Sequence, residues 1–451
     1  AGLQPTSILR AAGEITAAYV PPAGAISEFR VETTAFDASY GQTEGGAVNI
    51  SLKAGTNALH GSAYWAKMDP ALNANLFFSN RIGTPRGDFN YNRWGTSLGG
   101  PVYLPKLYDG RNRTFFMHAY EGIHESRPRG ATLTVPTEKQ RGGDLSDLLS
   151  VGPQYQIHDP ATRRMTADGR FQSDPLPGNI IPTHRINEVG KNILSYFGLP
   201  NTKGEADGRN NLALPNEPEN TAYFNHTARV DHNLSDRHRF FVRASTYTRN
   251  STYFDWFKNE ASGEWFAFRA RNAALDDVYV FDATTVMNIR YGFNRLVRDR
   301  DGRPSARGFD LTKLGFPAEY NAAIPASVRR FPLIYMDGYA DTWRPTSYRP
   351  VESHSLNWTL DKVAGAHTLR FGFEHRRYRE NQLETENSAS GAFGLGSDWT
   401  LGPYDTSAPA PLGQSLEDVL LGLPTWGYID RVDSYAEQST VWAGYVHDVW
   451  K

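Results

Sequence analysis

Three pairs of alternating segments, each pair joined by a short turn, constrain the fold of this chain most strongly. The second members of the pairs are RFFVRASTY, NIRYGFN and TLRFGFEHR, at residues 239–247, 288–294 and 368–376. Their apolar side chains recur at every second position, with Phe241 as an exception, and a period of two is that of a β-strand. Each follows a four-residue turn and an earlier alternating run, at residues 223–234, 273–281 and 353–363. The spacing predicts three antiparallel hairpins with tight turns.

Long segments separate the hairpins. They are rich in Gly, Pro, Asn, Asp and Arg, and they cover roughly residues 127–221, 248–269, 298–351 and 380–437. We interpret them as polar, irregular loops, which are hard to fit inside a compact soluble domain. Short turns at one end of the strands and long loops at the other are typical of outer-membrane barrels. The sequence therefore predicts an all-β, antiparallel, up-and-down transmembrane β-barrel.

Composition removes several other classes of protein. No apolar run approaches the ~20 residues of a membrane helix, which excludes helical spanning. A barrel remains compatible with the mean hydropathy of -0.53, because only every second residue of its strands faces lipid. The chain has 0 Cys, which excludes disulfides, thiolate metal sites and cysteine nucleophiles. Its net charge of -2 gives no basic surface for nucleic acid.

The two faces of the predicted strands differ in chemistry. The apolar side chains are expected to face outward to lipid: Phe240, Val242, Ile289, Tyr291, Leu369, Phe371 and Phe373. An arginine on the lipid side near mid-membrane costs ~2–4 kcal/mol, so the charged residues are expected to face the lumen. These are Arg229, Asp231, Arg239, Arg243, Arg290, Arg370, Glu374 and Arg376. The solvated face of a soluble sheet would give the same alternation.

A glycine-rich stretch, YGQTEGGAVNISLKAGTNALHGSAYW at residues 40–65, precedes these strands. Several glycines beside strand-forming sequence indicate bulges or the close approach of another backbone. We predict that this segment is packed inside the barrel, with close approach to the wall at Gly41, Gly45, Gly46 and Gly55. The triplet at residues 55–57 would form the break before the first wall strand. A glycine-rich hairpin of a soluble β protein is the alternative.

Several motifs together resemble a known family. They are EFRVETTAFDASYGQTEGGAVNISLKAGTNALHGSAYW, RWGTSLGGPVY, RTFFMHAYEG, LTVPT, PGNIIPTHRI, ARVDHNLSDRHRFFVR and YVHDVWK. In this order they resemble the TonB-dependent outer-membrane receptors of Gram-negative bacteria, specifically the Oar-like branch, across nearly the whole chain. The resemblance implies a large barrel occluded by an N-terminal plug, which takes up a ligand with energy relayed through TonB. It also implies that residues 1–57 are the end of the plug and residues 58–451 the first part of the barrel.

The chain also departs from the family pattern. No TonB box, carboxypeptidase-regulatory-like domain or signal peptide precedes Ala1, so coupling to TonB is expected through a segment outside this chain. We expect about ten wall strands, whereas plugged outer-membrane transporters have ~22. The expected sheet is therefore open, and its first and last strands do not pair. Alone, such a sheet would leave unpaired backbone in hydrocarbon and is expected to aggregate.

No sequence motif indicates catalysis, a cofactor or a metal. Residues 299–302 have only part of a calcium-loop spacing, without its later ligands. The adjacent pairs at residues 124–125 and 374–375 would point to opposite faces of a strand and cannot share a metal. No G-x-S-x-G or H-E-x-x-H motif is present. We therefore expect a protein that is not an enzyme.

Three functional hypotheses follow. The first is a TonB-dependent transporter in the outer membrane, with membrane lipid, TonB and an unidentified imported ligand as partners and no nucleic acid. The second is a surface-binding or adhesion protein on the same barrel. The third is a secreted carbohydrate-binding β protein with stacking platforms such as Trp256, Trp265 and Trp343. In a barrel, the wall charges could hold the plug or line a ligand path, and the need of enclosed charges for partners favours the first role.

Overall fold

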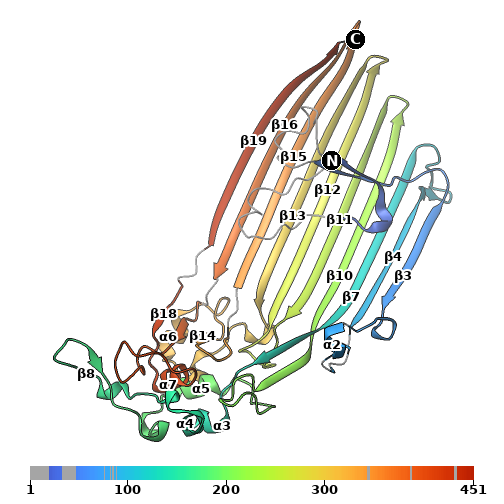
Figure 1. Ribbon diagram of the computed structural model, residues 1–451. Coiled ribbons are helices and arrows are strands. Elements are labelled where there is room, and N and C mark those ends of the chain that lie inside the picture. The colour runs from blue at the N-terminus through green and yellow to red at the C-terminus, as the bar shows by residue number, and fades with distance from the viewer. Residues whose placement is uncertain are drawn as a thin grey trace.

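A curved ten-stranded antiparallel sheet, here called the wall, dominates the computed structural model (Figure 1). The structure describes residues 20–32, 47–75, 77–81, 83, 86–87, 89–342, 346–385, 389–430 and 434–450. The strand order follows the sequence from β3 to β19, so the wall has the predicted up-and-down topology. In the described part of the chain, β3 and β19 are its two edges and do not pair with each other.

The wall strands confirm the three predicted hairpins. β10 pairs with β11, β12 with β13 and β15 with β16, each across a tight turn. The ten wall strands are β3 (His60–Met68), β4 (Asn90–Pro101), β7 (Thr114–Leu133), β10 (Leu212–Ser235), β11 (His238–Tyr253), β12 (Glu264–Asp282), β13 (Thr285–Gly302), β15 (Thr346–Ala364), β16 (His367–Thr385) and β19 (Ser434–Trp450).

The wall strands are longer than a membrane requires. β10 has 24 residues and β12 has 19, whereas a spanning strand needs only about 9–11. The strands therefore extend into the segments that the sequence pattern assigned to loops. Those loop boundaries were wrong, because a strand end with polar residues on both faces shows no period-two alternation.

Strand register separates the two faces of the wall. Arg229 of β10 lies opposite Arg243 of β11, while Val230 lies opposite Val242. The same alternation continues across the sheet, with Arg290 opposite Asp276 and Ile289 opposite Asp277. The charged set and the apolar set named above therefore project from opposite faces.

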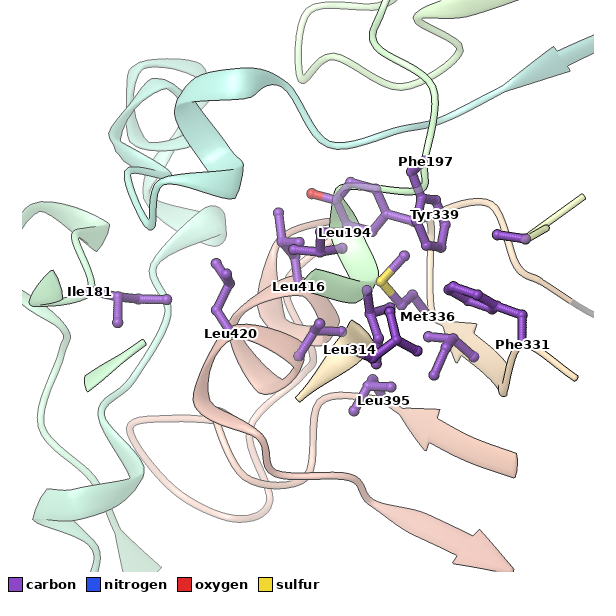
Figure 2. Packing of buried hydrophobic residues seen from close by; sticks show 14 of the residues in the cluster. Ile181, Leu194, Phe197, Leu314, Phe331, Met336, Tyr339, Leu395, Leu416 and Leu420 are labelled. Atoms are coloured by element: carbon purple, nitrogen blue, oxygen red, sulfur yellow. The ribbon is translucent and has the colours of Figure 1, made fainter. Parts of the chain in front are cut away.

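The long loops do not remain irregular. Together they form a compact second body, here called the cap, at the end of the strands that is opposite the C-terminus (Figure 1). The cap contains one large hydrophobic core. Figure 2 shows side chains from three different loops pointing toward one another in this core, including Leu194, Leu314 and Leu416. The prediction of polar, irregular loops was wrong, because each loop carries only part of the core and shows no periodicity by itself.

Short helices and strands build the cap. Its α-helices are α3 (Glu138–Arg141), α4 (Ser146–Val151), α5 (Glu188–Leu194), α6 (Ala318–Ala323) and α7 (Gln414–Leu421). Its 3-10 turns are η4 (Pro153–Tyr155), η5 (Pro160–Thr162), η6 (Pro177–Asn179), η7 (Thr183–Arg185), η8 (Pro304–Ala306) and η9 (Leu311–Leu314). Its strands are β8 (Arg164–Met165), β9 (Phe171–Gln172), β14 (Leu333–Met336), β17 (Ala392–Leu395) and β18 (Trp426–Tyr428).

Ion pairs join the cap to the ends of the wall strands. Asp301 of β13 accepts hydrogen bonds from Arg330 Nε and Nη2, both at 2.7 Å, and is also paired with Arg307 at 2.7 Å. Asp301 and Arg330 are both buried. The partial calcium-loop spacing at residues 299–302 thus belongs to an arginine-binding strand end.

Before the wall, the chain forms a short hairpin. It comprises η1 (Ala23–Ala25), β1 (Ile26–Glu32) and β2 (Ala47–Leu52), and the two strands pair antiparallel. Smaller elements occur in the connections between the first wall strands: η3 (Pro70–Leu72), α2 (Phe77–Arg81), β5 (Tyr103–Leu104) and β6 (Tyr108–Asp109).

Candidate functional site: the N-terminal segment on the inner face of the wall

Residues 20–32 and 47–57, here called the N-terminal segment, contact one face of the wall, here called the inner face, which carries Glu121 and Asn225. Glu121 of β7 is buried, with 4% of its surface exposed. It accepts hydrogen bonds from Tyr64 Oη, from Arg93 Nη2 at 2.8 Å and from the backbone N–H of Ala23 at 3.3 Å. A buried carboxylate requires such partners. Glu121 therefore joins the first three wall strands to the start of η1.

A second contact lies one strand further along the sheet. Asn225 of β10 is fully buried and donates a hydrogen bond of 2.6 Å to the carbonyl of Val20. Next to the Glu121 contact, Ala25 packs against Met117 and Ala119 of β7, together with Leu52 of β2. The segment is thus held by one charged contact, one amide and a small apolar cluster.

The segment continues into β3 through a second close approach. A Cβ at Gly55 would lie 2.3 Å from the carbonyl oxygen of Phe116, so only glycine fits at this distance from β7. Asn57 then accepts a hydrogen bond of 2.7 Å from the backbone N–H of Asn112, in the connection between β4 and β7. The break at residues 55–57 is where the chain leaves the inner face and enters the wall.

The remaining glycines of the predicted plug cannot be placed. Gly41, Gly45 and Gly46 lie outside the described residues. The assignment of residues 1–57 to a plug domain therefore stays a prediction, although residues 20–25 and 55 contact the wall as described above.

The predicted charged residues lie on the same inner face as Glu121 and Asn225. The strand register shows this, because Asn225 lies opposite Glu121. Arg229 is four residues further along the same strand, and residues an even number apart on a strand share a face. Most of the set forms ion pairs within the wall. The pairs are Arg229 with Asp231 at 2.6 Å, Arg290 with Asp276, Arg370 with Asp361 at 2.6 Å, and Arg376 with Glu374 at 2.5 Å.

Two arginines complete this set. Arg243 lines a small hollow together with Arg290, Glu374 and Arg376. Arg239 lies opposite Asn233, close to the tight turn between β10 and β11, and is exposed. The ion pairs above join wall residues to wall residues, so a role in holding the plug stays a prediction for all eight.

The inner face also explains the apolar exception in β11. Phe241 lies opposite Asp231, and the guanidinium of Arg229 is 3.9 Å from the centre of its ring. A guanidinium over an aromatic face is attracted by the ring quadrupole. Phe241 thus supports a charged side chain on the face where the alternation predicts only polar residues.

Sequence reasoning missed Glu121 and Asn225 as contact residues. Glu121 is the carboxylate in the mainly apolar run FFMHAYEGI, and that isolated charge was the available signal. Asn225 gave no signal, because an asparagine in a strand is unremarkable until its partner is known.

The described residues show neither a cluster of metal ligands nor a membrane-spanning helix. In the described ranges, no group of three or more His, Cys, Asp or Glu side chains could hold a metal ion. No helix among the residues that can be described is long and apolar enough to cross a membrane. The contacts of Glu121, Asn225 and Ala25 make the inner face a site of contact between chain segments.

Comparison with known proteins identifies the class. Residues 51–451 match the outer membrane beta barrel domain, so the chain belongs to this family and its location is the outer membrane. Curated proteins gave no match.

Solved structures are similar at low identity. The outer membrane transporter YddB from Escherichia coli is 8% identical, with a TM-score of 0.46 over 90% of this chain and 39% of that one. The siderophore receptor PiuA from Acinetobacter baumannii is 11% identical, with a TM-score of 0.40 over 95% and 52%. The ferric-catecholate import receptor Fiu from E. coli K12 is 9% identical, with a TM-score of 0.38 over 94% and 57%. The chain thus spans about two fifths to three fifths of their lengths.

Proposed function

We propose that this chain is part of a TonB-dependent outer-membrane receptor of the Oar-like branch, which imports a ligand. The observation that carries the proposal is the docking of residues 20–25 on the inner face of the wall through Glu121 and Asn225. A segment held inside a barrel blocks diffusion through it, so passage of a ligand requires energy to move that segment. The order of motifs along the chain supports the same family.

In this proposal, the wall and the N-terminal segment have different tasks. The wall forms the channel in the outer membrane, and the N-terminal segment is the end of the plug. TonB acts on the plug through a coupling segment outside this chain. The ion pairs of the inner face neutralise the wall charges, so that a polar ligand can pass without being trapped by single uncompensated charges.

Uptake by living cells tests the proposal. Culture medium is compared after growth of the parent strain, a strain without the full-length gene and a strain without TonB. We expect at least one compound to be depleted by the parent and by neither mutant. A compound that the parent and the TonB-deficient strain deplete equally, and whose depletion needs the gene, would instead support surface binding and overturn the transport proposal.

A further inference from the structure

The cap carries a small three-stranded sheet with one exposed aromatic face. β14 and β17 run parallel, and β18 pairs antiparallel with β17. One face of this sheet packs into the cap core through Ile334, Met336 and Leu395. The other face carries a row in which Tyr335, Gly394 and Trp426 lie side by side in register.

Gly394 allows the two aromatic residues to form one surface. A Cβ at Gly394 would lie 2.0 Å from the indole ring of Trp426, so the ring lies directly over the central strand. The centre of the Trp426 ring is 5.8 Å from that of Tyr335 and 5.8 Å from that of Tyr428, with which it is stacked. Trp426 is nevertheless 45% exposed. Large aromatic side chains that are half exposed and mutually supported are typical of binding surfaces.

Two carboxylates lie at one end of this surface. Asp337 follows β14, and Asp398 comes three residues after β17. Because the two strands are parallel, their carboxyl ends meet at the same edge of the sheet. Both aspartates line a cleft of about 300 Å³, together with Tyr335, Trp426, Ser397 and Thr425.

The cleft is negatively charged. No Lys, Arg or His lines it, and neither aspartate forms an ion pair in the part of the chain that the structure describes. Both aspartates are exposed to solvent. The cleft thus combines the face of an indole ring, which attracts cations, with two carboxylates.

We propose that this cleft binds a cationic group of a peptide, an ammonium or a guanidinium, at the outer surface of the cap. The ring of Trp426 would contact the cation, and Asp337 and Asp398 would accept its hydrogen bonds. A neutral sugar gains less from this cleft, because the two carboxylates attract a cation and give a neutral molecule no charge–charge attraction.

This inference rests on the proposed function only in placing the cap outside the cell. It concerns binding, and it can be measured without transport. Failure of import in cells would leave the binding result standing, and failure of binding would leave import of another ligand open. The two proposals therefore fail separately.

Calorimetric titration of the full-length protein in detergent with tri-lysine tests the inference. We expect tri-lysine to bind and tri-glutamate not to bind. Asp337→Asn is expected to weaken binding by about fivefold, which is the upper range for one exposed ion pair. The double variant Asp337→Asn, Asp398→Asn is expected to weaken it further, and raised salt is expected to weaken the parent more than the double variant.

A matched variant controls for loss of charge alone. Asp405 is another exposed carboxylate of the cap that does not line the cleft, so Asp405→Asn is expected to leave binding unchanged. Gly394→Ala displaces the Trp426 ring and is expected to weaken binding with both carboxylates intact. Equal affinity of the parent and the double variant for tri-lysine would overturn the inference. So would binding of cellotriose at this cleft in place of tri-lysine.

Discussion

The wall and the cap of this protein are stabilised in opposite ways. The wall has long backbone ladders, but its buried apolar clusters have only three residues each, and nearly all side chains of its edge strand β19 are exposed. The cap has only short elements, yet it contains a large buried core contributed by distant loops. The comparison indicates that the wall is stabilised mainly by its backbone ladders, whereas the cap is stabilised by a buried apolar core, like a water-soluble domain.

The two regions also differ in how their carboxyl groups are paired. On the inner face of the wall, carboxylates are paired with arginines. In the cap, helix α7 is buried over residues 414–420 and carries Glu417 and Asp418, which form no ion pair among the described residues. Burial raises the pKa of Asp418 to about 8, and burial together with the neighbouring Asp418 raises the pKa of Glu417. The carboxyl group of Asp418 is therefore expected to be protonated in the folded cap at neutral pH.

A cavity in the cap core is expected to show most clearly that the cap and the wall are stabilised independently. Leu416 is fully buried, and Leu416→Ala is expected to destabilise the cap by about 2–5 kcal/mol. Limited proteolysis of the full-length protein in outer membranes would detect faster cleavage in the cap, while the heat-modifiable electrophoretic shift of the barrel stays unchanged. Val446→Ala, on β19 where the side chain is 67% exposed, is the control. Loss of the barrel shift in Leu416→Ala would show that the two regions are not separate.

An added charge should distinguish the two faces of the wall. Val242→Arg places a cation on the apolar face, and we expect a cost of about 2–4 kcal/mol in the membrane. Phe241→Arg is the matched variant on the inner face, where Asp231 lies opposite, and it is expected to cost less. Urea unfolding in lipid vesicles measures both. A larger loss for Phe241→Arg than for Val242→Arg would reverse the assignment of the faces.

Acidity should affect the cap more than the wall. A carboxyl group whose pKa is raised in the folded state holds a proton that the unfolded chain releases. For Asp418 the stability of the cap is therefore expected to fall as pH rises from about 4 to about 8, by up to about 1.4 kcal/mol per pH unit for one group.

The Asp418→Asn variant tests this dependence. It is expected to flatten the decline, measured as hydrogen exchange of cap amides at several pH values. Hydrogen bonds from Arg185 lower the pKa of Asp159, which therefore titrates below this range and does not mask the effect. An unchanged slope in Asp418→Asn would contradict the prediction.

The smallest effect is expected from an ion pair of the wall. Arg370 and Asp361 are 2.6 Å apart, but 42% and 40% of their side chains are exposed. Exposed pairs contribute about 0–1 kcal/mol, so Asp361→Asn should change the urea midpoint of the wall only slightly. A loss as large as that of Val242→Arg would mean that inner-face charges hold the wall together.

The wall and the cap also differ in how well the sequence predicts them. Period-two alternation predicted the hairpins of β10 to β16, because one face of each strand is mostly apolar. The cap could not be predicted, since Leu194, Leu314 and Leu416 come from three loops far apart in the sequence and meet only in the folded protein. Only part of the candidate site could be predicted from the sequence. The face of the charged residues followed from alternation and Gly55 from its backbone freedom, whereas the partners of Glu121 and Asn225 depend on three-dimensional contact.

The central claim is that the N-terminal segment is held on the inner face of the wall, and a disulfide cross-link tests it most directly. A Cβ at Gly24 would lie 3.3 Å from Cβ of Ser97, close to the ~3.5–4.5 Å found in disulfides, and the chain contains no cysteine of its own. In the full-length protein in outer membranes, Gly24→Cys with Ser97→Cys is expected to cross-link on oxidation. Gly24→Cys with Leu98→Cys, where residue 98 projects from the other face, is expected to remain reduced. Equal cross-linking of both pairs, or none in the first, would contradict the account.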